Sequence, residues 1–446
     1  MNIVAVYRQA YRGLPRRAWI LFAVNLVNSS GAMVIFFLSL YLTRKLGFSP
    51  ARAGQALSLY GVGSLAGAFL GGWLADKIGS ITVQKASLAI CGVLLIALGQ
   101  AHSPWGILSL LFSMALFAGM LYPANATSMS RICPPSIQVK GFALNRLANN
   151  LGATIGPAVG GVLALSDYRL LFWADGLTSL VAAGIFVIIW RGPGLKGSAG
   201  TTGSSGEGGV GPNGSDGRLR ERAAEPDGRS AAGATARRSD TSPGSMAAAP
   251  VIVKPSSPWR DRPFLLLMVM FMLWSAVFIQ VLTTFPIYMR DVYGLAENRI
   301  GQLFAVNTAL IVFLEMILME KIRKYPLTRM INLSFILLGA GFGLIPFGRG
   351  FAFACLATAI LTFGEMLSMP LVTALIAGRA DDATRGRYMG VFSFSFSLAF
   401  IISPAAGTAI YERFGGDAVW VVCAAVCLLL TAAFFALRPA LEKGVK

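Results

Sequence analysis

Long runs of apolar residues alternate with short polar segments along almost the whole chain. A helix needs about 20 apolar residues to cross the hydrocarbon core of a bilayer, and runs of that length recur with few charges inside them. Twelve such runs predict twelve membrane-spanning helices, six on each side of a long polar segment. The predicted spans are 18–42, 53–74, 83–101, 105–128, 140–165, 169–190, 264–288, 300–320, 328–347, 351–377, 388–411 and 418–438.

The polar segment in the middle, 192–262, is dominated by Gly, Ser, Ala and Arg, with hardly any large apolar side chain. Such a composition buries too little surface to offset the entropy cost of ordering. We therefore expect a disordered basic linker between an N-terminal six-helix bundle, 1–191, and a C-terminal six-helix bundle, 263–446. A plain tether is the favoured role. Binding of anionic lipid or a regulatory role is the alternative, because basic segments next to a membrane attract anionic lipid.

The charge of the chain sets its expected orientation. Its 446 residues carry a formal net charge of +18, yet only 13% are charged and the mean hydropathy is +0.65. The basic residues lie between the apolar runs, which argues against nucleic-acid binding and fits the positive-inside pattern. Both ends of the chain and the linker fall on the basic side. We expect a multi-pass protein of the cytoplasmic membrane with both termini in the cytoplasm.

Residue types that support catalysis or metal binding are scarce. His102 is the only histidine, and the five cysteines lack the spacing of a disulfide framework or a zinc site. A phosphate-binding loop of the Walker type is absent from the sequence, so direct driving by ATP is not expected. We expect no enzyme activity, no cofactor and no bound metal. The expected partners are a small-molecule substrate, protons and the lipid bilayer, and the expected state is a monomer.

The two halves of the chain align with each other. At a shift of 247 residues, Tyr41 falls on Tyr288 and Pro157 falls on Pro404. Several matches at one shift, in helices far apart, indicate an internal repeat. Repeats joined in this parallel way place a substrate site between the halves near the middle of the membrane.

Two motifs resemble those of the major facilitator superfamily, and the resemblance extends over essentially the whole chain outside the linker. The stretch GGWLADKIGS, residues 71–80, is similar to the family's signature after its second helix. Its matching residues are Gly72, Leu74, Asp76 and Gly79, with Lys77 in place of an arginine. The stretch GATIGPAVGG resembles the fifth-helix motif of proton-driven antiporters, and it matches at Gly152, Gly156, Pro157, Gly160 and Gly161.

This resemblance, closest to the branch of drug/proton antiporters, implies an all-α membrane protein of two pseudo-symmetric six-helix bundles that transports by alternating access. It also implies that Asp76 latches against the start of the eleventh helix, near 384–387, in the outward-facing state. Two features depart from the family. Ser80 replaces a usual basic residue, and the fourth helix lacks the arginine that drug antiporters usually carry before its central glycine.

The glycines of both motifs have a physical interpretation of their own. In the first motif, Gly71 and Gly72 are expected to allow close packing and Gly79 a tight reversal. In the second, glycines at a step of four share one helix face, which lets another helix approach closely, and Pro157 tends to bend the helix. Two interpretations of this face stay open: a tight static contact, or a sliding or sealing face between the halves.

Ionisable residues inside the predicted spans are the candidate transport residues, because charge at that depth is expensive. Glu365, in the middle of the tenth span, is the first candidate for proton coupling or substrate binding; the alternative is a fixed hydrogen bond to a neighbouring helix. Glu315, in the eighth span, is a second proton site or a partner for Lys321 or another base. Asp175, near the outer end of the sixth span, is favoured as a structural pair or hydrogen-bonding group.

Two further polar residues are candidates for the site. Arg146 enters the fifth span among three asparagines, where it either snorkels to the surface or meets an anionic substrate or a carboxylate. Asn28, in the first span, either lines the cavity or merely bridges two helices.

These observations predict a secondary active transporter. The favoured function is proton-coupled efflux of a small apolar or amphipathic compound, as in multidrug antiporters, with Glu365 as the main protonatable group and Glu315 as the second. An uptake symporter, or a lipid or lysolipid flippase, is the alternative within transporters. From a different class, a transport-dead receptor or scaffold that signals through the linker stays open.

Overall fold

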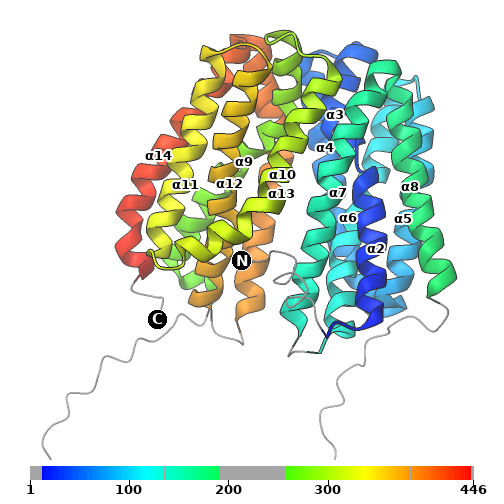
Figure 1. Cartoon of the computed structure of the whole chain (residues 1–446), viewed down its shortest axis with the longest axis horizontal. Coiled ribbons are helices and arrows are strands. Elements are labelled where there is room, and N and C mark those ends of the chain that lie inside the picture. The colour runs from blue at the N-terminus through cyan, green and yellow to red at the C-terminus, as the bar shows by residue number, and fades with distance from the viewer. Residues whose placement is uncertain (1–12, 135–136, 191–256, 381–383, 443–446) are drawn as a thin grey trace, which may run out of the picture. The chain divides into compact units, whose positions relative to one another are not determined.

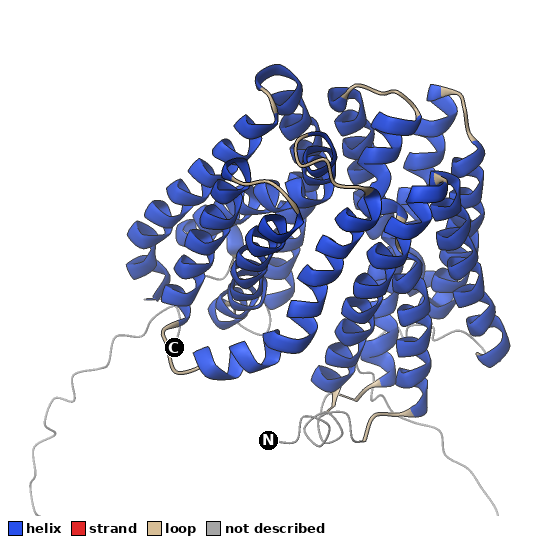
Figure 2. Ribbon diagram, turned by 45° about the horizontal axis from the view of Figure 1, so that its top comes forward, coloured by secondary structure: helices blue, strands red, loops and turns tan. Residues whose placement is uncertain are grey.

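The computed structural model describes residues 13–134, 137–190, 257–380 and 384–442, which belong to one compact unit. Helices and loops make up all of this described part (Figures 1 and 2). The predicted linker lies outside the described residues except for 257–262. Its last residues form a short 3₁₀ turn, Pro258–Arg260, directly before the next long helix.

The first six spans form the N-terminal bundle. The first span is broken in two, and a π-helical turn, Tyr41–Lys45, follows its second piece. The helices are α2 (Arg16–Gly31), α3 (Val34–Leu40), α4 (Pro50–Leu74), α5 (Ser80–Gln100), α6 (Pro104–Ile132), α7 (Gln138–Ser166) and α8 (Tyr168–Ile189).

The last six spans form the C-terminal bundle, on the other side of Figure 1. A short 3₁₀ turn, Ile345–Phe347, follows its third helix. The helices are α9 (Arg262–Asp291), α10 (Glu297–Ile322), α11 (Leu327–Leu344), α12 (Phe351–Arg379), α13 (Arg385–Phe414) and α14 (Gly416–Glu442).

The described helices confirm the predicted fold class. By length and hydropathy, 10 stretches could each cross a membrane. One of them, Pro50–Gln100, contains both α4 and α5, because the π-helical turn Ala75–Gly79 joins these helices without a gap. The remaining span, α7, falls outside the 10 because asparagines and glycines lower its hydropathy. The twelve predicted spans are therefore all helices in the structure.

Local sequence explains where several helices begin. Ser49 and Ser103 precede α4 and α6, and each side-chain oxygen accepts a hydrogen bond from the backbone N–H three residues on. A proline follows each serine at the first helical position, where its missing N–H costs nothing. Asp261 caps α9 in the same way by accepting from Phe264 N at 3.2 Å.

Apolar side chains fill the interior of both bundles and also cover much of the outer surface. The largest buried side chains include Trp274 and Trp420 in the C-terminal bundle. The Trp420 ring stacks on Phe342, with centroids 5.9 Å apart. Large apolar side chains such as Phe313 and Leu429 are exposed on the outside, as expected of helices that face lipid.

The spans run alternately up and down, so their ends form two faces. We call the face where α2 begins and α14 ends the terminal end, and the other face the opposite end (Figure 1). The two bundles contact each other toward the opposite end. There Arg44 pairs with Asp291 of the other bundle, and Ala51 N donates to a Glu412 carboxylate oxygen at 2.8 Å. An ion pair and hydrogen bonds between described residues therefore join the bundles on this side.

Glycines bring the two bundles close at the same end. Gly61 of α4 lies against the carbonyl of Phe400 on α13, and a Cβ there would come within 2.9 Å of that oxygen. Gly301 of α10 lies against the carbonyl of Pro157 on α7 in the same manner, and Gly161 lies against the start of α10. The contact between α7 and α10 thus depends on positions without a side chain.

The glycine face of α7 agrees with a tight contact inside the fold. A Cβ at Gly152 would meet Ser29, and one at Gly160 would meet Met33 at 2.9 Å, both in the first span of the same bundle. Contacts to the other bundle come instead from Pro157 and Gly161. In this structure the face does not seal the halves against each other, although two residues of the same motif do.

Replacing Gly301 with Leu is expected to open the opposite end, because the new side chain has no room beside the Pro157 carbonyl. Cysteines placed at Ala51 and Glu412, on α4 and α13, should be joined by a short bifunctional thiol reagent more completely in the parent than after Gly301→Leu. Gly390→Leu, at a position with open space around it, is the matched control and should cross-link like the parent. Equal cross-linking in all three would contradict the prediction.

Candidate substrate and proton site

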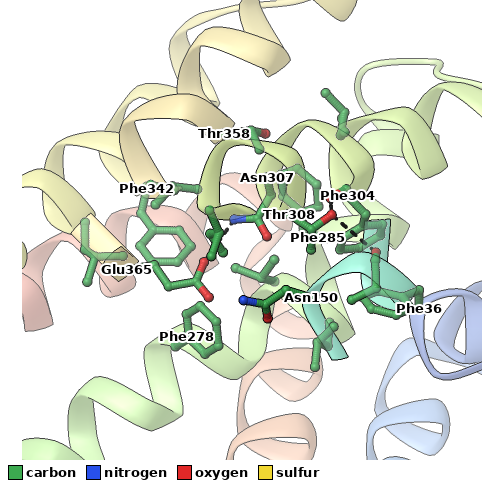
Figure 3. A pocket seen from close by; sticks show the side chains of 17 residues that line it. Phe36, Asn150, Phe278, Phe285, Phe304, Asn307, Thr308, Phe342, Thr358 and Glu365 are labelled. Carbon is green, nitrogen blue, oxygen red and sulfur yellow. Dashed lines mark hydrogen bonds between the residues drawn. The ribbon is translucent and has the colours of Figure 1, made fainter. Parts of the chain in front are cut away.

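A cavity of about 260 Å³ lies between the two bundles. Helices α3, α7, α9, α10, α11 and α12 contribute its walls. Most of the lining is apolar, and it includes five aromatic rings: Phe36, Phe278, Phe285, Phe304 and Phe342. The polar lining residues are Asn150, Asn307, Thr308, Thr358 and Glu365 (Figure 3). Among the described residues that line this central cavity, Glu365 is the only one with a formal charge.

Glu365 lies in the middle of α12, as predicted, and its neighbour is Asn307 of α10. The Asn307 amide donates hydrogen bonds of 2.9 Å to Glu365 Oε2 and 2.9 Å to Thr362 Oγ1. The predicted alternative, a hydrogen bond to a neighbouring helix, is therefore present. It occupies one carboxylate oxygen, and Figure 3 shows the carboxylate and the Asn150 amide directed into the same space. The group can thus be held in place and still meet a ligand.

One polar residue of the lining has an unpaired hydroxyl. The side-chain oxygen of Thr358 is fully buried and has no hydrogen-bond partner among the described residues. Buried polar groups are rarely left unpaired, because the lost hydrogen bond is costly.

A second cavity of about 490 Å³ lies next to the first, nearer the terminal end. The two cavities share Asn150 and Ile311 as lining residues. In the second cavity the Arg146 guanidinium on α7 donates to the Glu315 carboxylate on α10, so one ion pair joins the bundles here. The Arg146 side chain is 54% exposed and that of Glu315 only 12%. Of the interpretations left open for Arg146, a carboxylate partner fits this geometry.

Asp175 and Asn28 lie away from the central cavity. Asp175 of α8 accepts a hydrogen bond from Val34 N at 3.2 Å, at the start of α3. The Asn28 side-chain oxygen accepts from the Ser179 hydroxyl at 3.3 Å. Both residues line a smaller cavity inside the N-terminal bundle. The structure thus places Glu365 in one cavity and the Arg146–Glu315 pair in the neighbouring one, and it places the other two candidates elsewhere.

The turn after α4 has the predicted reversal. Gly79 adopts a φ of 94°, a left-handed conformation that favours glycine. Gly71 packs against Met120, as predicted, but a Cβ at Gly72 would meet open space, so the prediction of close packing at Gly72 is wrong. Leu74 packs against a small buried cluster in the N-terminal bundle. The glycines of this motif therefore have different roles.

The two charged residues of this turn contact their own bundle. Asp76 pairs with Arg131 of α6 at 3.6 Å, and its side chain is 77% exposed. The Lys77 ammonium lies over the Trp73 ring at 4.0 Å from its centroid. The family resemblance implies that Asp76 contacts 384–387 in the outward-facing state. In this structure the two bundles contact each other toward the opposite end instead. The latch therefore stays a prediction.

Asp76→Asn is expected to slow turnover and leave substrate affinity nearly unchanged, because Asp76 is far from the central cavity. Its ion pair with Arg131 is exposed, so losing it should cost at most about 1 kcal/mol of stability. Reconstituted flux and equilibrium binding, measured side by side, check this. Unaltered turnover would count against the latch, and a large loss of affinity would mean that the residue acts on the site.

Sequence reasoning missed several residues of the cavity. Asn307 and Thr358 are single polar residues in apolar helices, a pattern that also suits helix bridging. The phenylalanines could not be told apart from lipid-facing ones. The internal repeat gave the position of the cavity between the halves, but not the side chains that line it.

Comparisons with known proteins agree with this architecture. The model of the Major Facilitator Superfamily matches residues 20–382 and 322–446. A Na(+), Li(+), K(+)/H(+) antiporter of Planococcus maritimus is 23% identical over 397 residues, covering 85% of each chain. The multidrug resistance protein MdtH of Cronobacter sakazakii is 23% identical over 400 residues, covering 87% of this chain and 85% of its own.

A solved structure of a POT family transporter, in complex with a thioalcohol conjugated peptide, has the same fold. It superposes with a TM-score of 0.75 at 16% identity, covering 97% of this chain and 98% of that chain. At this identity the likeness concerns the fold alone. The family model, by contrast, matches most of the chain. This chain therefore belongs to the Major Facilitator Superfamily, and it is a multi-pass membrane transporter.

Proposed function

We propose that this protein exports a small, largely apolar compound, neutral or cationic, in exchange for protons. The observation that carries the proposal is Glu365, the one charged group among the described residues that line the cavity between the bundles. Burial of apolar groups among phenylalanine rings favours binding. The faces of such rings also attract cations. An anion would meet the like charge of Glu365 with no basic side chain in the described lining.

The same carboxylate supports exchange with protons. A carboxylate in an apolar cavity can hold a proton, and a cationic substrate bound beside it would favour release of that proton, because a nearby positive charge stabilises the ionised form. The second cavity, which shares Asn150 with the first, lies on the side where both would move toward the terminal end. If that end lies in the cytoplasm, as the positive-inside pattern favours, the described conformation faces inward. Export then requires Arg44 and Asp291 to separate on the other side.

The names of two relatives support antiport as the reaction type. One is called a cation/proton antiporter and the other a multidrug resistance protein. The two names differ in the compound moved, so they support the exchange and not one substrate. Uptake of the substrate together with protons would depend on the same residues. Dye accumulation under opposite pH gradients distinguishes this symport from antiport.

The test is accumulation of apolar dyes by proteoliposomes of the purified protein, with the membrane potential clamped. Ethidium serves as the cationic probe, with a panel of neutral dyes beside it. An acidic lumen should drive accumulation of at least one probe, and protein-free liposomes should show none. Accumulation only with an alkaline lumen would favour symport, and none under either gradient would contradict proton coupling.

A further inference from the structure

A third cavity lies inside the N-terminal bundle, separate from the central one. Its volume is about 110 Å³, enough for a small ion with one or two waters, since a water takes about 30 Å³. Helices α2, α3, α4, α5, α6 and α8 enclose it. Its polar lining residues are Asn28, Tyr60, Cys91, Asp175 and Ser179. We call this space the Asp175 cavity.

Asp175 is buried there without a basic partner. The residue is 8% exposed, the cavity lining contains no Lys, Arg or His, and none of the ion pairs among the described residues involves it. The backbone amide of Val34, at the start of α3, donates to its carboxylate at 3.2 Å. This is a neutral donor. A buried carboxylate without an opposite charge is expensive, so a cation in the adjoining cavity would stabilise it.

Neutral oxygen atoms surround the same space. The Asn28 amide oxygen and the Ser179 hydroxyl lie 3.3 Å apart, and Tyr60 adds a phenolic hydroxyl from α4. One full negative charge with several neutral oxygens suits a hard monovalent cation; divalent cations usually have more carboxylates. Coupling ions in transporters are commonly bound where a membrane helix is interrupted. The first span is interrupted at this point, between Gly31 and Val34.

We propose that the Asp175 cavity binds a small monovalent metal cation, Na⁺ or Li⁺, through the Asp175 carboxylate. Asn28, Tyr60 and Ser179 provide the neutral oxygens. This site is distinct from Glu365, and its existence does not depend on the proposed export.

Helix α3 connects the Asp175 cavity to the central cavity. Val34, Ile35 and Leu38 line the former, whereas Phe36 lines the latter and packs on Phe304 of the other bundle at 4.9 Å between ring centroids. Asp175 bonds directly to the first residue of α3. A cation bound to the Asp175 carboxylate would change the strength of its hydrogen bond to Val34, which fixes the start of α3. Because Phe36 of α3 lines the central cavity, the wall of that cavity would change as well. Ion binding in one bundle is thereby coupled to the substrate site.

Thermal unfolding of the purified full chain tests the proposal. The midpoint is measured in NaCl, LiCl and choline chloride at equal ionic strength. Wild-type protein should be stabilised by Na⁺ or Li⁺ over choline in a saturable way. Asp175→Asn keeps an acceptor for the Val34 amide but loses the charge, so it should lose this increment. Ser179→Ala should raise the half-saturating concentration about tenfold, the usual scale for altered metal surroundings.

Glu365→Gln is the control and should keep the full cation increment. Equal midpoints in Na⁺, Li⁺ and choline would overturn the proposal, as would an unchanged increment in Asp175→Asn. Loss of the increment in Glu365→Gln would place the cation in the central cavity and also overturn it. If Asp175→Asn does not fold, the Ser179→Ala titration decides: an unchanged half-saturating concentration overturns the site. Dye accumulation is a separate readout, so this failure is distinguishable from failure of proton-coupled export.

Discussion

Glu365→Gln is expected to abolish dye accumulation driven by a pH gradient and to leave the protein folded. Glutamine has nearly the same size, and its amide oxygen can still accept the hydrogen bond from Asn307. It cannot bind a proton at neutral pH, so proton movement down the gradient can no longer drive dye movement through the central cavity. Accumulation should fall to the level of protein-free liposomes, measured with the dye that the wild type moves best.

Exchange of labelled for unlabelled neutral dye needs no proton movement and should persist in Glu365→Gln within a few-fold of the wild-type rate. Glu442→Gln is the matched control, because Glu442 lies at the end of α14 and bonds to Thr328 and Arg438 there. Its accumulation should equal that of the wild type. Wild-type accumulation by Glu365→Gln would mean that another carboxylate couples transport, and loss of exchange as well would indicate a role in substrate binding.

The helices could be predicted from the sequence, because crossing a bilayer requires a certain length and the apolar runs have that length. The ends of the helices were predicted less well: the structure extends the eleventh span to Arg385–Phe414, beyond the predicted 388–411. Polar residues at helix ends bond to water or to lipid headgroups and therefore leave no apolar signal. The break in the first span was also missed, although the adjacent Ser29, Ser30 and Gly31 are residues at which membrane helices often kink.

The candidate site could be predicted from the sequence only in part. Glu365 stands out because an ionisable residue is rare in an apolar helix, and this holds for any fold. Its partner Asn307 is 58 residues away, and Arg146 is 169 residues from Glu315. Pairings at such separations depend on how the helices pack against each other, and the pattern of a single sequence does not predict that packing. For the same reason the pattern could not tell which neighbour the α7 glycines face.

Removing one member of the ion pair between Arg379 and Asp261 is expected to destabilise the fold more than any other exchange of a paired charge. The guanidinium of Arg379, at the end of α12, donates to both Asp261 oxygens at 2.7 and 2.8 Å. Their side chains are 6% and 1% exposed. Tyr388 donates to the same carboxylate at 3.2 Å, and Arg379 also donates to the Leu441 carbonyl at 3.1 Å. This cluster joins four helices, α9, α12, α13 and α14, at the terminal end.

Arg379→Ala leaves the Asp261 carboxylate buried without its counter-charge, and such a loss costs about 3–5 kcal/mol. The midpoint of thermal unfolding in detergent should drop by several degrees, and the folded yield should fall with it. Arg438→Ala is the matched control, because its ion pair with Glu442 lies at the same end and is 24% and 43% exposed. Exposed pairs contribute at most about 1 kcal/mol, so this variant should unfold close to the wild type. Equal midpoints for the two variants would show that burial does not set the strength of these pairs. Because Asp261 directly precedes α9, the predicted outcome would also mean that the C-terminal bundle is anchored one residue before the end of the predicted linker.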